Sequence, residues 1–367
     1  MNEDKAARYR RAQRTTFWIG LALGVAALLV LLPGGGAAAL RDWLVQATGL
    51  SATSPFAAVL FAVILLAGAE VVALPMTVYR ARLDKRIENP DQIRPVTLPD
   101  LVKTFAVNSA LAALAVFVIY LAMALSPAWW WLIAIGLAAV GGAVFGRRAS
   151  VYPQSFFQCA RLERSALRDR LEALAGRAGV NALDLYEWIP QAGSGQTNAR
   201  LLGARDSCRI LLSRTLLADF SADELEVIVA HELGHHVHGD IPSARRVAVL
   251  VTVVMAAAAA AALNVLWRRL GLSAPNDIAG LPILAAAVGL ILALTRPVLN
   301  GVSRRSEFRA DRFAVALTGR PDVFASAMRR IAARNLAEPR PSLSTVWLFH
   351  SHPSVEQRIR AARAPQA

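Results

Sequence analysis

The chain has 367 residues, of which 55% are apolar and only 18% are charged. This composition is far more apolar than that of an average soluble globular protein, and it favours a membrane protein. Lysine and arginine (40) outnumber aspartate and glutamate (26), which gives a net charge of +14. The basic residues form no continuous face and no patch interleaved with aromatic residues, so we expect a lipid bilayer rather than nucleic acid as a partner.

Six segments have the length and apolarity to cross a bilayer, whose core needs about 20 apolar residues in a helix. The last of them is slightly short but adequate. The six segments are Thr15–Pro33, Pro55–Tyr79, Phe105–Leu125, Ala128–Gly146, Val247–Trp267 and Ile278–Thr295.

Basic residues gather beside alternate segments, as the positive-inside rule predicts for cytoplasmic loops. The tail before the first segment and the connection after the second are rich in arginine and lysine, whereas the first connection contains only Arg41. We therefore expect a multi-pass protein of the cell membrane with both termini in the cytoplasm. A cleaved signal peptide is the alternative for the first segment, although its apolar run exceeds the roughly 7–15 residues typical of such peptides.

The segments divide the chain into four regions. Residues 1–146 form an N-terminal membrane region with four spans, 147–246 a polar cytoplasmic part, 247–302 two further spans, and 303–367 a cytoplasmic C-terminal part. Within the polar part, QSFFQCARLERSALRDRLEALAGRAG has helical spacing and ends in glycines, which predicts a helix. The runs LDLYEWI and CRILLS predict two strands of a small sheet joined by a loop. Cys159 and Cys208 are expected to be reduced, small buried residues.

The stretch SADELEVIVAHELGHHVHGD, residues 221–240, has four histidines within eight residues. Ser221 and Glu224 predict a capping box that opens a helix, and Gly239 predicts its end. Pro242 suits the first turn of the helix that follows.

His231 and His235 lie four residues apart on one helix face, so both can bind one metal ion. Glu232 is turned about 100° around the axis and can reach a water molecule on that ion. Zinc lowers the pKa of such a water from about 15.7 toward 7, and a neighbouring carboxylate can take its proton during attack on a peptide carbonyl. His236 and His238 point to other faces and are expected to be solvated or hydrogen-bonded.

A catalytic zinc ion needs a third protein ligand. The segment NGVSRRSEFRADRFA supplies Glu307 and Asp311, four residues apart on a helix predicted to continue from the sixth span. One of them can bind the ion while the other hydrogen-bonds a ligand histidine. Glu307 has the longer reach and suits the ion. Asp240 and His238 are poorer candidates, because Gly239 ends the first helix and one straight helix cannot easily aim three rings at one ion.

These motifs resemble those of the membrane zinc metallopeptidases of the CAAX prenyl protease type, a superfamily that includes the bacterial heat-shock membrane protease. The motifs are HELGH (His231–His235), SRRSEFRAD (Ser303–Asp311), TNARLLG (Thr197–Gly203) and HPSVEQRI (His352–Ile359), in the family's order. The resemblance covers roughly residue 151 to the C-terminus. It implies a mainly α membrane protein of about six transmembrane helices with a cytoplasmic α+β zincin-like (gluzincin) catalytic domain.

The resemblance also implies roles for individual residues. His231, His235 and Glu307 would bind one Zn²⁺ per chain, Glu232 would be the catalytic base, and Asp311 would orient His231. Asn198 would hold the substrate backbone at an exposed strand edge. His352 and Arg358 match tail positions near the family's active site, where they would either polarise the scissile carbonyl or be purely structural.

The expected function is an integral-membrane zinc endopeptidase that cleaves membrane-associated or misfolded substrates at the cytoplasmic face. Six spans are one fewer than the seven of the eukaryotic prenyl proteases. The sequence therefore does not decide whether the intramembrane chamber is closed, or which class of substrate is cleaved. A transporter is the rival hypothesis, because Glu70 lies within the second span. A non-catalytic membrane scaffold is a third.

Overall fold

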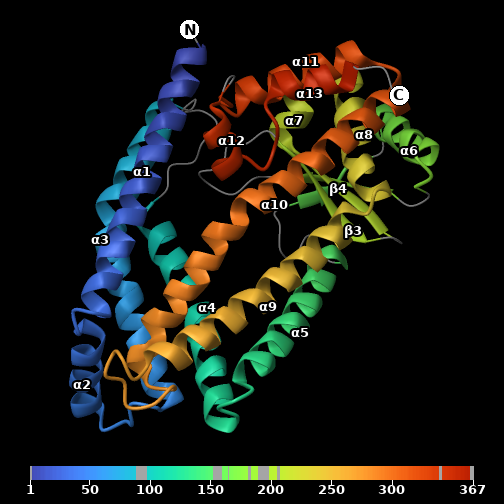
Figure 1. Ribbon diagram of the computed structural model, residues 1–367. Helices are drawn as coiled ribbons and strands as arrows, with labels where there is room; N and C mark the ends of the chain where they lie inside the picture. The colour runs from blue at the N-terminus through green and yellow to red at the C-terminus, as the bar shows by residue number, and fades with distance from the viewer. Residues whose placement is uncertain are drawn as a thin grey trace.

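The computed structural model describes residues 2–87, 97–151, 159–163, 165–180, 183–188, 198–204, 207–338 and 341–363. Long helices run between the two ends of the molecule (Figure 1). One end, called the sheet end, carries a small β-sheet and the C-terminal helix α13 (Val355–Arg363). The opposite end, called the far end, carries connections between the long helices.

Five helical stretches among the described residues are long and apolar enough to cross a membrane. Many of their large apolar side chains are exposed, as expected of a surface that faces lipid rather than water. A sixth apolar stretch, Trp130–Phe145 of α5 (Trp130–Val151), is shorter. The predicted mainly α membrane fold with about six spans is therefore confirmed. The five stretches are Ala7–Leu31 of α1 (Asn2–Leu31), Pro55–Arg80 of α3 (Pro55–Ile87), α4 (Leu98–Leu125), α9 (Asp240–Leu266), and Ile278–Thr318, which joins η2 (Ile278–Gly280) to α10 (Leu281–Thr318).

The first connection is a helix rather than a simple loop. α2 (Gly36–Thr48) lies between two glycines with positive φ, 72° at Gly35 and 70° at Gly49. It buries Ala37 and Leu44. With 13 residues it is too short to span a bilayer and fits a core or re-entrant helix. Sequence analysis missed it because only the length needed for a full crossing was considered.

A partly buried ion pair joins two connections at the far end. Arg41 on α2 donates to Asp277 over 2.7 Å, and the Asp277 side chain is fully buried just before η2. Asp277 also accepts hydrogen bonds from the backbone N–H and the hydroxyl of Ser273. The Tyr120 hydroxyl on α4 donates to the Asp277 carbonyl. Two connections predicted on one side of the membrane thus meet in space.

Four strands form one sheet in the order β1-β2-β4-β3. The predicted strands are present as β2 (Leu183–Trp188) and β4 (Ser207–Ser213), which pair in parallel. The predicted loop between them contains a further strand, β3 (Ala199–Ala204), which pairs antiparallel with β4. β3 lies at one edge of the described sheet.

The predicted long helix before the sheet is wrong over Cys159–Arg161. Cys159–Arg161 form strand β1, which pairs antiparallel with β2, and Leu162 N–H donates to the Leu185 carbonyl. The helix, α6 (Ala166–Arg177), begins only after Ser165, whose hydroxyl accepts from the Arg168 N–H. Pairing with a distant strand overrides the local helical spacing. Residues 154–158, which begin the predicted helix, lie outside the described part of the chain.

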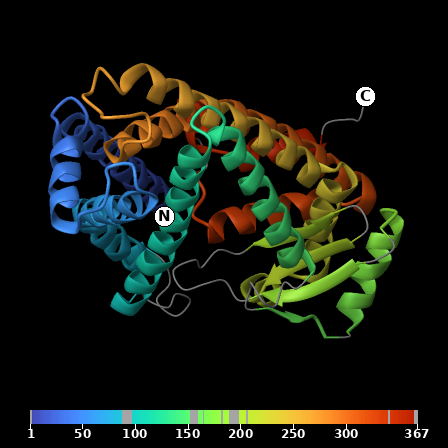
Figure 2. The same ribbon diagram turned by 90° about the horizontal axis from the view of Figure 1, so that it is seen from below.

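α8 (Ala222–Val237) lies at the centre of the sheet-end core. It packs against α10, α11 (Pro321–Arg334), α6 and β3, and a continuous apolar cluster joins these elements. α10 has 38 residues and is therefore about 57 Å long, well beyond a bilayer core of about 30 Å. One helix thus runs from the membrane region into the sheet-end core, as predicted. Seen from below, α5 lies between the sheet and the N-terminal helices (Figure 2).

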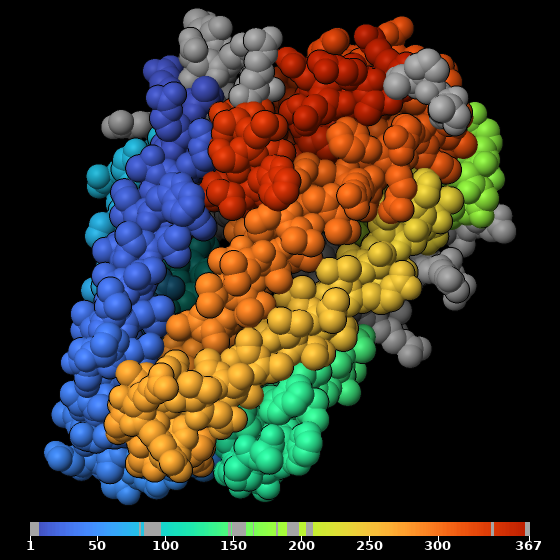
Figure 3. Space-filling view, in the orientation of Figure 1, coloured from blue at the N-terminus to red at the C-terminus, as the bar shows by residue number. Residues whose placement is uncertain are grey.

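One face of α1 holds the C-terminal region (Figure 3). Arg10 donates to the backbone carbonyls of Asn335 and Leu336, and Arg14 forms a 2.5 Å ion pair with Glu338. Below this contact, the Phe17 and Trp18 rings pack edge-on against Phe349 at the end of α12 (Leu343–Phe349). The N-terminal helix is thus tied to the segment that precedes His352.

Candidate active site

The helix that carries the HELGH motif starts at the predicted capping box. The Ser221 hydroxyl accepts from the Glu224 N–H, and the Ser221 N–H donates to the Glu224 carboxylate over 3.0 Å. The same carboxylate accepts from Ser326 and Arg330 on α11. The first turn of α8 is therefore fixed to a second helix as well as capped.

His231 and His235 project from α8 toward Glu307 on α10. The two Nε2 atoms lie 3.1 Å apart, and each is 3.5 Å from a different carboxylate oxygen of Glu307. The three residues form the only group among the described residues whose ligand atoms are arranged to hold a metal ion, all within 4.8 Å of one another. The prediction that these side chains lie together therefore agrees with the structure.

A glycine allows α8 and α10 to approach closely beside this cluster. A Cβ atom at Gly234 would lie only 3.0 Å from the Ala310 Cα on α10. Any larger side chain would push the two helices apart. Glu307 and Asp311 lie on either side of Ala310 in sequence, so this crossing brings both carboxylates to the histidine face of α8.

Asp311 contacts His231 rather than joining the three-residue cluster. Its carboxylate is fully buried and lies 3.0 Å from His231 Nδ1. Arg358 on α13 donates two hydrogen bonds to the same carboxylate, from Nη2 to Oδ1 over 2.6 Å and from Nε to Oδ2 over 2.9 Å. The Arg358 guanidinium is 3.3 Å from His231 Nδ1 and 3.4 Å from a Glu307 oxygen. These contacts suit a residue that positions Asp311 and neutralises its charge.

Asp240 makes the matching contact with the second histidine, a role that sequence analysis missed. Gly239, with φ 66°, turns the chain sharply between α8 and α9. Asp240 then folds back so that its carboxylate lies 2.7 Å from His235 Nδ1. Arg309 on α10 pairs with the other Asp240 oxygen. The sequence HVHGD places Asp240 five residues after His235, but sequence analysis considered it only as a metal ligand and not as a hydrogen-bond partner of His235.

The donor set fits a divalent metal ion. One carboxylate oxygen of Glu307, Oε2, is buried and has no hydrogen-bond partner among the described residues. The other lies 2.9 Å from Nδ1 of His352, whose side chain is 64% exposed. Arg358 and His231 Nε2 lie 3.4 and 3.5 Å from Oε2 without a hydrogen bond to it. Since a buried oxygen without a hydrogen bond is costly, a cation between the Glu307 carboxylate and the two rings would satisfy it.

Electrostatics at the cluster favour a positive charge. Burial and the Arg358 cation lower the pKa of His231, but Asp311 and Glu307 outweigh them and raise it to about 9. The same acidic surroundings stabilise a bound cation, which would replace that proton. Burial raises the pKa of Glu232, whose carboxylate lies beside the cluster without belonging to it.

A cavity of about 920 Å³ opens onto the cluster. His231, Glu232, His235 and Glu307 line its polar part. Its opposite part runs between α9 and α10 and is mostly apolar, with lining residues that include Val247, Val251, Met255, Leu292, Leu299 and Val302. The cavity therefore combines a catalytic-type polar centre with an apolar floor.

The edge strand β3 forms another wall of this cavity. Asn198 and the β3 residues Ala199–Leu202 line it. The backbone N–H and carbonyl of Asn198 are bonded to Ser213 on β4, and the residue is exposed. Its side chain is therefore available at the sheet edge that faces the cluster of His231, His235 and Glu307. Thr197, the first residue of the TNARLLG motif, lies outside the described residues.

Comparison with known proteins identifies the family. Residues 161–366 match peptidase family M48, and residues 2–146 match the CAAX prenyl protease N-terminal domain, described as five membrane helices. The chain is a member of peptidase family M48. It is therefore a membrane metallopeptidase that acts on peptide or protein substrates.

Individual relatives of this M48 chain agree. It is 24% identical over 367 residues to the uncharacterized metalloprotease YhfN of Bacillus subtilis (strain 168), covering 97% of this chain and 84% of the relative. It is 29% identical over 212 residues to a protease HtpX homolog of Janthinobacterium sp. (strain Marseille), covering 54% and 71%. A crystal structure of S. mikatae Ste24p shares the fold, with a TM-score of 0.79, 19% identity, and 98% of this chain and 88% of that chain covered.

The family model describes residues 2–146 as five membrane helices, although α2 is too short to span a bilayer. Five helices, α1 to α5, occupy the described part of residues 2–146 once the short α2 is counted. Of the remaining residues singled out by sequence, His238 donates to the Gly234 carbonyl over 2.7 Å, and Cys208 is buried, which raises its thiol pKa to about 12. Glu70 is exposed on α3 and does not line the metallopeptidase cavity.

Proposed function

We propose that this metallopeptidase is a zinc endopeptidase of the cell membrane whose active site faces the cytoplasm. The observation that carries the proposal is the cluster of His231, His235 and Glu307, with Glu232 beside it in one cavity. Two histidines and a glutamate are a donor set that zinc enzymes use, with one position left open for water or substrate.

Zinc held by these three side chains would supply a Lewis acid that activates water and polarises the scissile carbonyl. Glu232 accepts the proton of the attacking water and returns it to the leaving amine, which requires a carboxylate close to the ion but not bound to it. Asp311 and Asp240 accept hydrogen bonds from the outer nitrogens of His231 and His235. These hydrogen bonds fix the orientation of both rings, so that both Nε2 atoms face the proposed zinc position beside Glu307.

Substrate main chain adds to β3 as a further strand. In the described sheet β3 has a paired neighbour on one side only, and its free side lines the cavity. The Asn198 amide can donate to and accept from a peptide backbone. An extended peptide bound there would run past the cluster, which suits cleavage within a chain rather than at its end.

The apolar floor between α9 and α10 supports membrane-associated or misfolded proteins as the substrate class. Such proteins expose apolar side chains, and the lining of this floor gives those side chains an apolar environment. A folded soluble protein would rarely present an extended apolar segment to a cavity at this position beside the membrane helices.

Metal analysis of the detergent-purified protein tests the central claim. We expect about one zinc per chain, and cleavage of a denatured protein that a chelator stops and added zinc restores. A folded sample that binds no zinc, or one whose hydrolysis survives complete metal removal, would contradict the proposal. If the protein is a non-catalytic scaffold, the denatured protein should not be cleaved, with or without zinc.

The cytoplasmic orientation rests on where the basic residues lie. The arginines of the first helix lie at the sheet end, whereas α2 and the α9–α10 connection lie at the far end. In a variant with Cys159→Ser and Cys208→Ala, we expect a cysteine at Asp42 or Asn276 to react with an impermeant thiol reagent in sealed cells. A cysteine at Glu172 should react only after lysis. Labelling of the Glu172 variant in sealed cells would place the metal cluster outside.

A further inference from the structure

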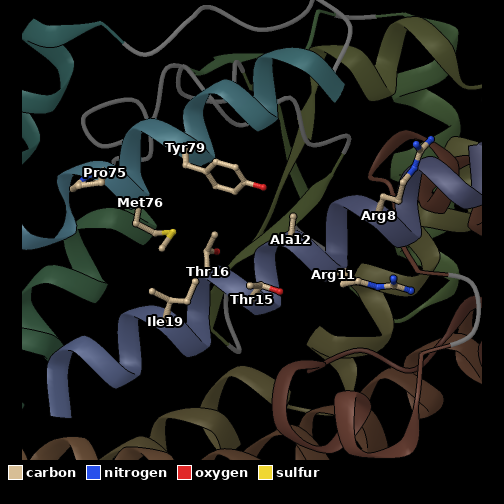
Figure 4. A pocket seen from close by; sticks show the side chains of 9 residues that line it. All are labelled: Arg8, Arg11, Ala12, Thr15, Thr16, Ile19, Pro75, Met76 and Tyr79. Carbon is tan, nitrogen blue, oxygen red and sulfur yellow. The ribbon is translucent and has the colours of Figure 1, made fainter. Parts of the chain in front are cut away.

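A second cavity, distinct from the metallopeptidase site, lies between α1 and α3 (Figure 4). Its volume is about 490 Å³, and all its described lining residues belong to these two helices. On α1 they recur at the spacing of one helix face, roughly opposite the face that binds Glu338 and Phe349. α1 therefore uses one side to hold the C-terminal region and the other to form this groove.

The groove changes from basic to apolar along its length. Arg8 and Arg11 line it near the sheet end, with the exposed Thr15 one turn further along. Ile19 lies about 12 Å along the helix from Arg11, and Met76 on α3 lines the groove as well. None of the described lining residues is acidic.

The two walls are joined by a side-chain hydrogen bond at the buried Thr16. Thr16 is buried, and its hydroxyl accepts from the Arg80 Nε on α3 over 2.8 Å. The same hydroxyl donates to the Gln13 carbonyl, also over 2.8 Å. The Arg80 contact ties α3 to α1, whereas the Gln13 contact lies within α1 and fixes the Thr16 hydroxyl. The two walls are therefore joined before any ligand enters. Tyr79 extends over it from α3 (Figure 4).

We propose that this groove binds an anionic phospholipid. Arg8 and Arg11 contact the headgroup phosphate, and one acyl chain lies along Ile19 and Met76. A free phosphate ion would gain nothing from the apolar half, and in a zwitterionic lipid the choline cation would offset the phosphate charge that the two arginines attract. Basic pockets between membrane helices attract anionic headgroups at the end where the helices leave the bilayer, and this groove opens at the start of the first span.

Lipid titration followed by native mass spectrometry tests the proposal with the full chain. The probes are phosphatidylglycerol and phosphatidylcholine with identical acyl chains, and inorganic phosphate as a competitor. We expect tighter binding of phosphatidylglycerol and no competition by phosphate at equal concentration. Equal binding of the two lipids, or displacement by phosphate, would overturn the proposed lipid site.

Variants separate this groove from ordinary boundary lipid. We expect Arg11→Gln to weaken phosphatidylglycerol binding roughly fivefold and Arg8→Gln with Arg11→Gln roughly 25-fold, because each cation near an anionic headgroup contributes on this scale. Arg148→Gln at the end of α5 is the matched control and should have no effect. Arg8 and Arg11 are exposed, and the melting temperature of each variant confirms folding. Unchanged binding in the double variant, or an equal loss in the control, would refute the assignment.

Discussion

Glu232→Gln is expected to lower the rate of peptide hydrolysis by about 10²- to 10⁴-fold while leaving metal content and melting temperature unchanged. Glutamine has nearly the same shape as glutamate but cannot accept a proton from water. Glu232 lines the cavity yet stands outside the three-residue cluster, so the exchange removes no proposed ligand. The measurement is cleavage of a denatured protein substrate alongside zinc analysis of the same sample. Turnover close to that of the parent would rule out this role.

Asn198→Ala is the contrasting variant for that experiment. It removes the amide at the sheet edge but no group near the proton transfer, so we expect a higher KM with retained metal. The backbone of Asn198 is bonded to Ser213, and alanine can keep both of those hydrogen bonds. Loss of zinc or of folding in this variant would make the residue structural. The pair therefore separates binding of the substrate from chemistry.

The α8 half of the site could be predicted because its determinants are local. A capping box fixes where α8 begins, and the helical repeat then puts His231 and His235 on one face. The contact of Glu307 and Asp311 with that face depends on how α10 crosses α8, which no local pattern specifies. Gly234 permits the crossing, but in the sequence it is only one small residue of the HELGH motif.

The missed features all depend on contacts between distant segments. β1 forms because Cys159–Arg161 pair with β2, although the same residues have helical spacing. α2 is stabilised at the far end, where Arg41 meets Asp277. Asp240 contacts His235 only because the chain turns at Gly239. From the sequence, a residue beyond the end of α8 was not expected to contact a histidine on that helix. Contacts between distant segments determine these three features, and the periodicity of apolar residues in the sequence hardly reflects such contacts.

The arrangement around His235 has a consequence for the third ligand. Asp240 contacts Nδ1 of His235 and pairs with Arg309, and Asp311 contacts Nδ1 of His231 and pairs with Arg358. Their charges are thus used in orienting the rings. Glu307 is the carboxylate that faces both Nε2 atoms, and its Oε2 atom has no hydrogen-bond partner in the described chain. We therefore propose it as the third zinc ligand.

Glu307→Ala is accordingly expected to lose most of its zinc, because two histidines alone hold the ion weakly. Asp311→Asn should keep zinc with an affinity about 10- to 100-fold lower, the usual cost of losing a group that orients a ligand. Asparagine is preferred to alanine because its carbonyl oxygen can still accept from Arg358, which limits the penalty of leaving a buried cation unpaired. Zinc affinity is measured by competition with a chelator, and melting temperature confirms folding. Parent-like zinc affinity in Glu307→Ala, together with loss of the metal in Asp311→Asn, would reverse the two assignments.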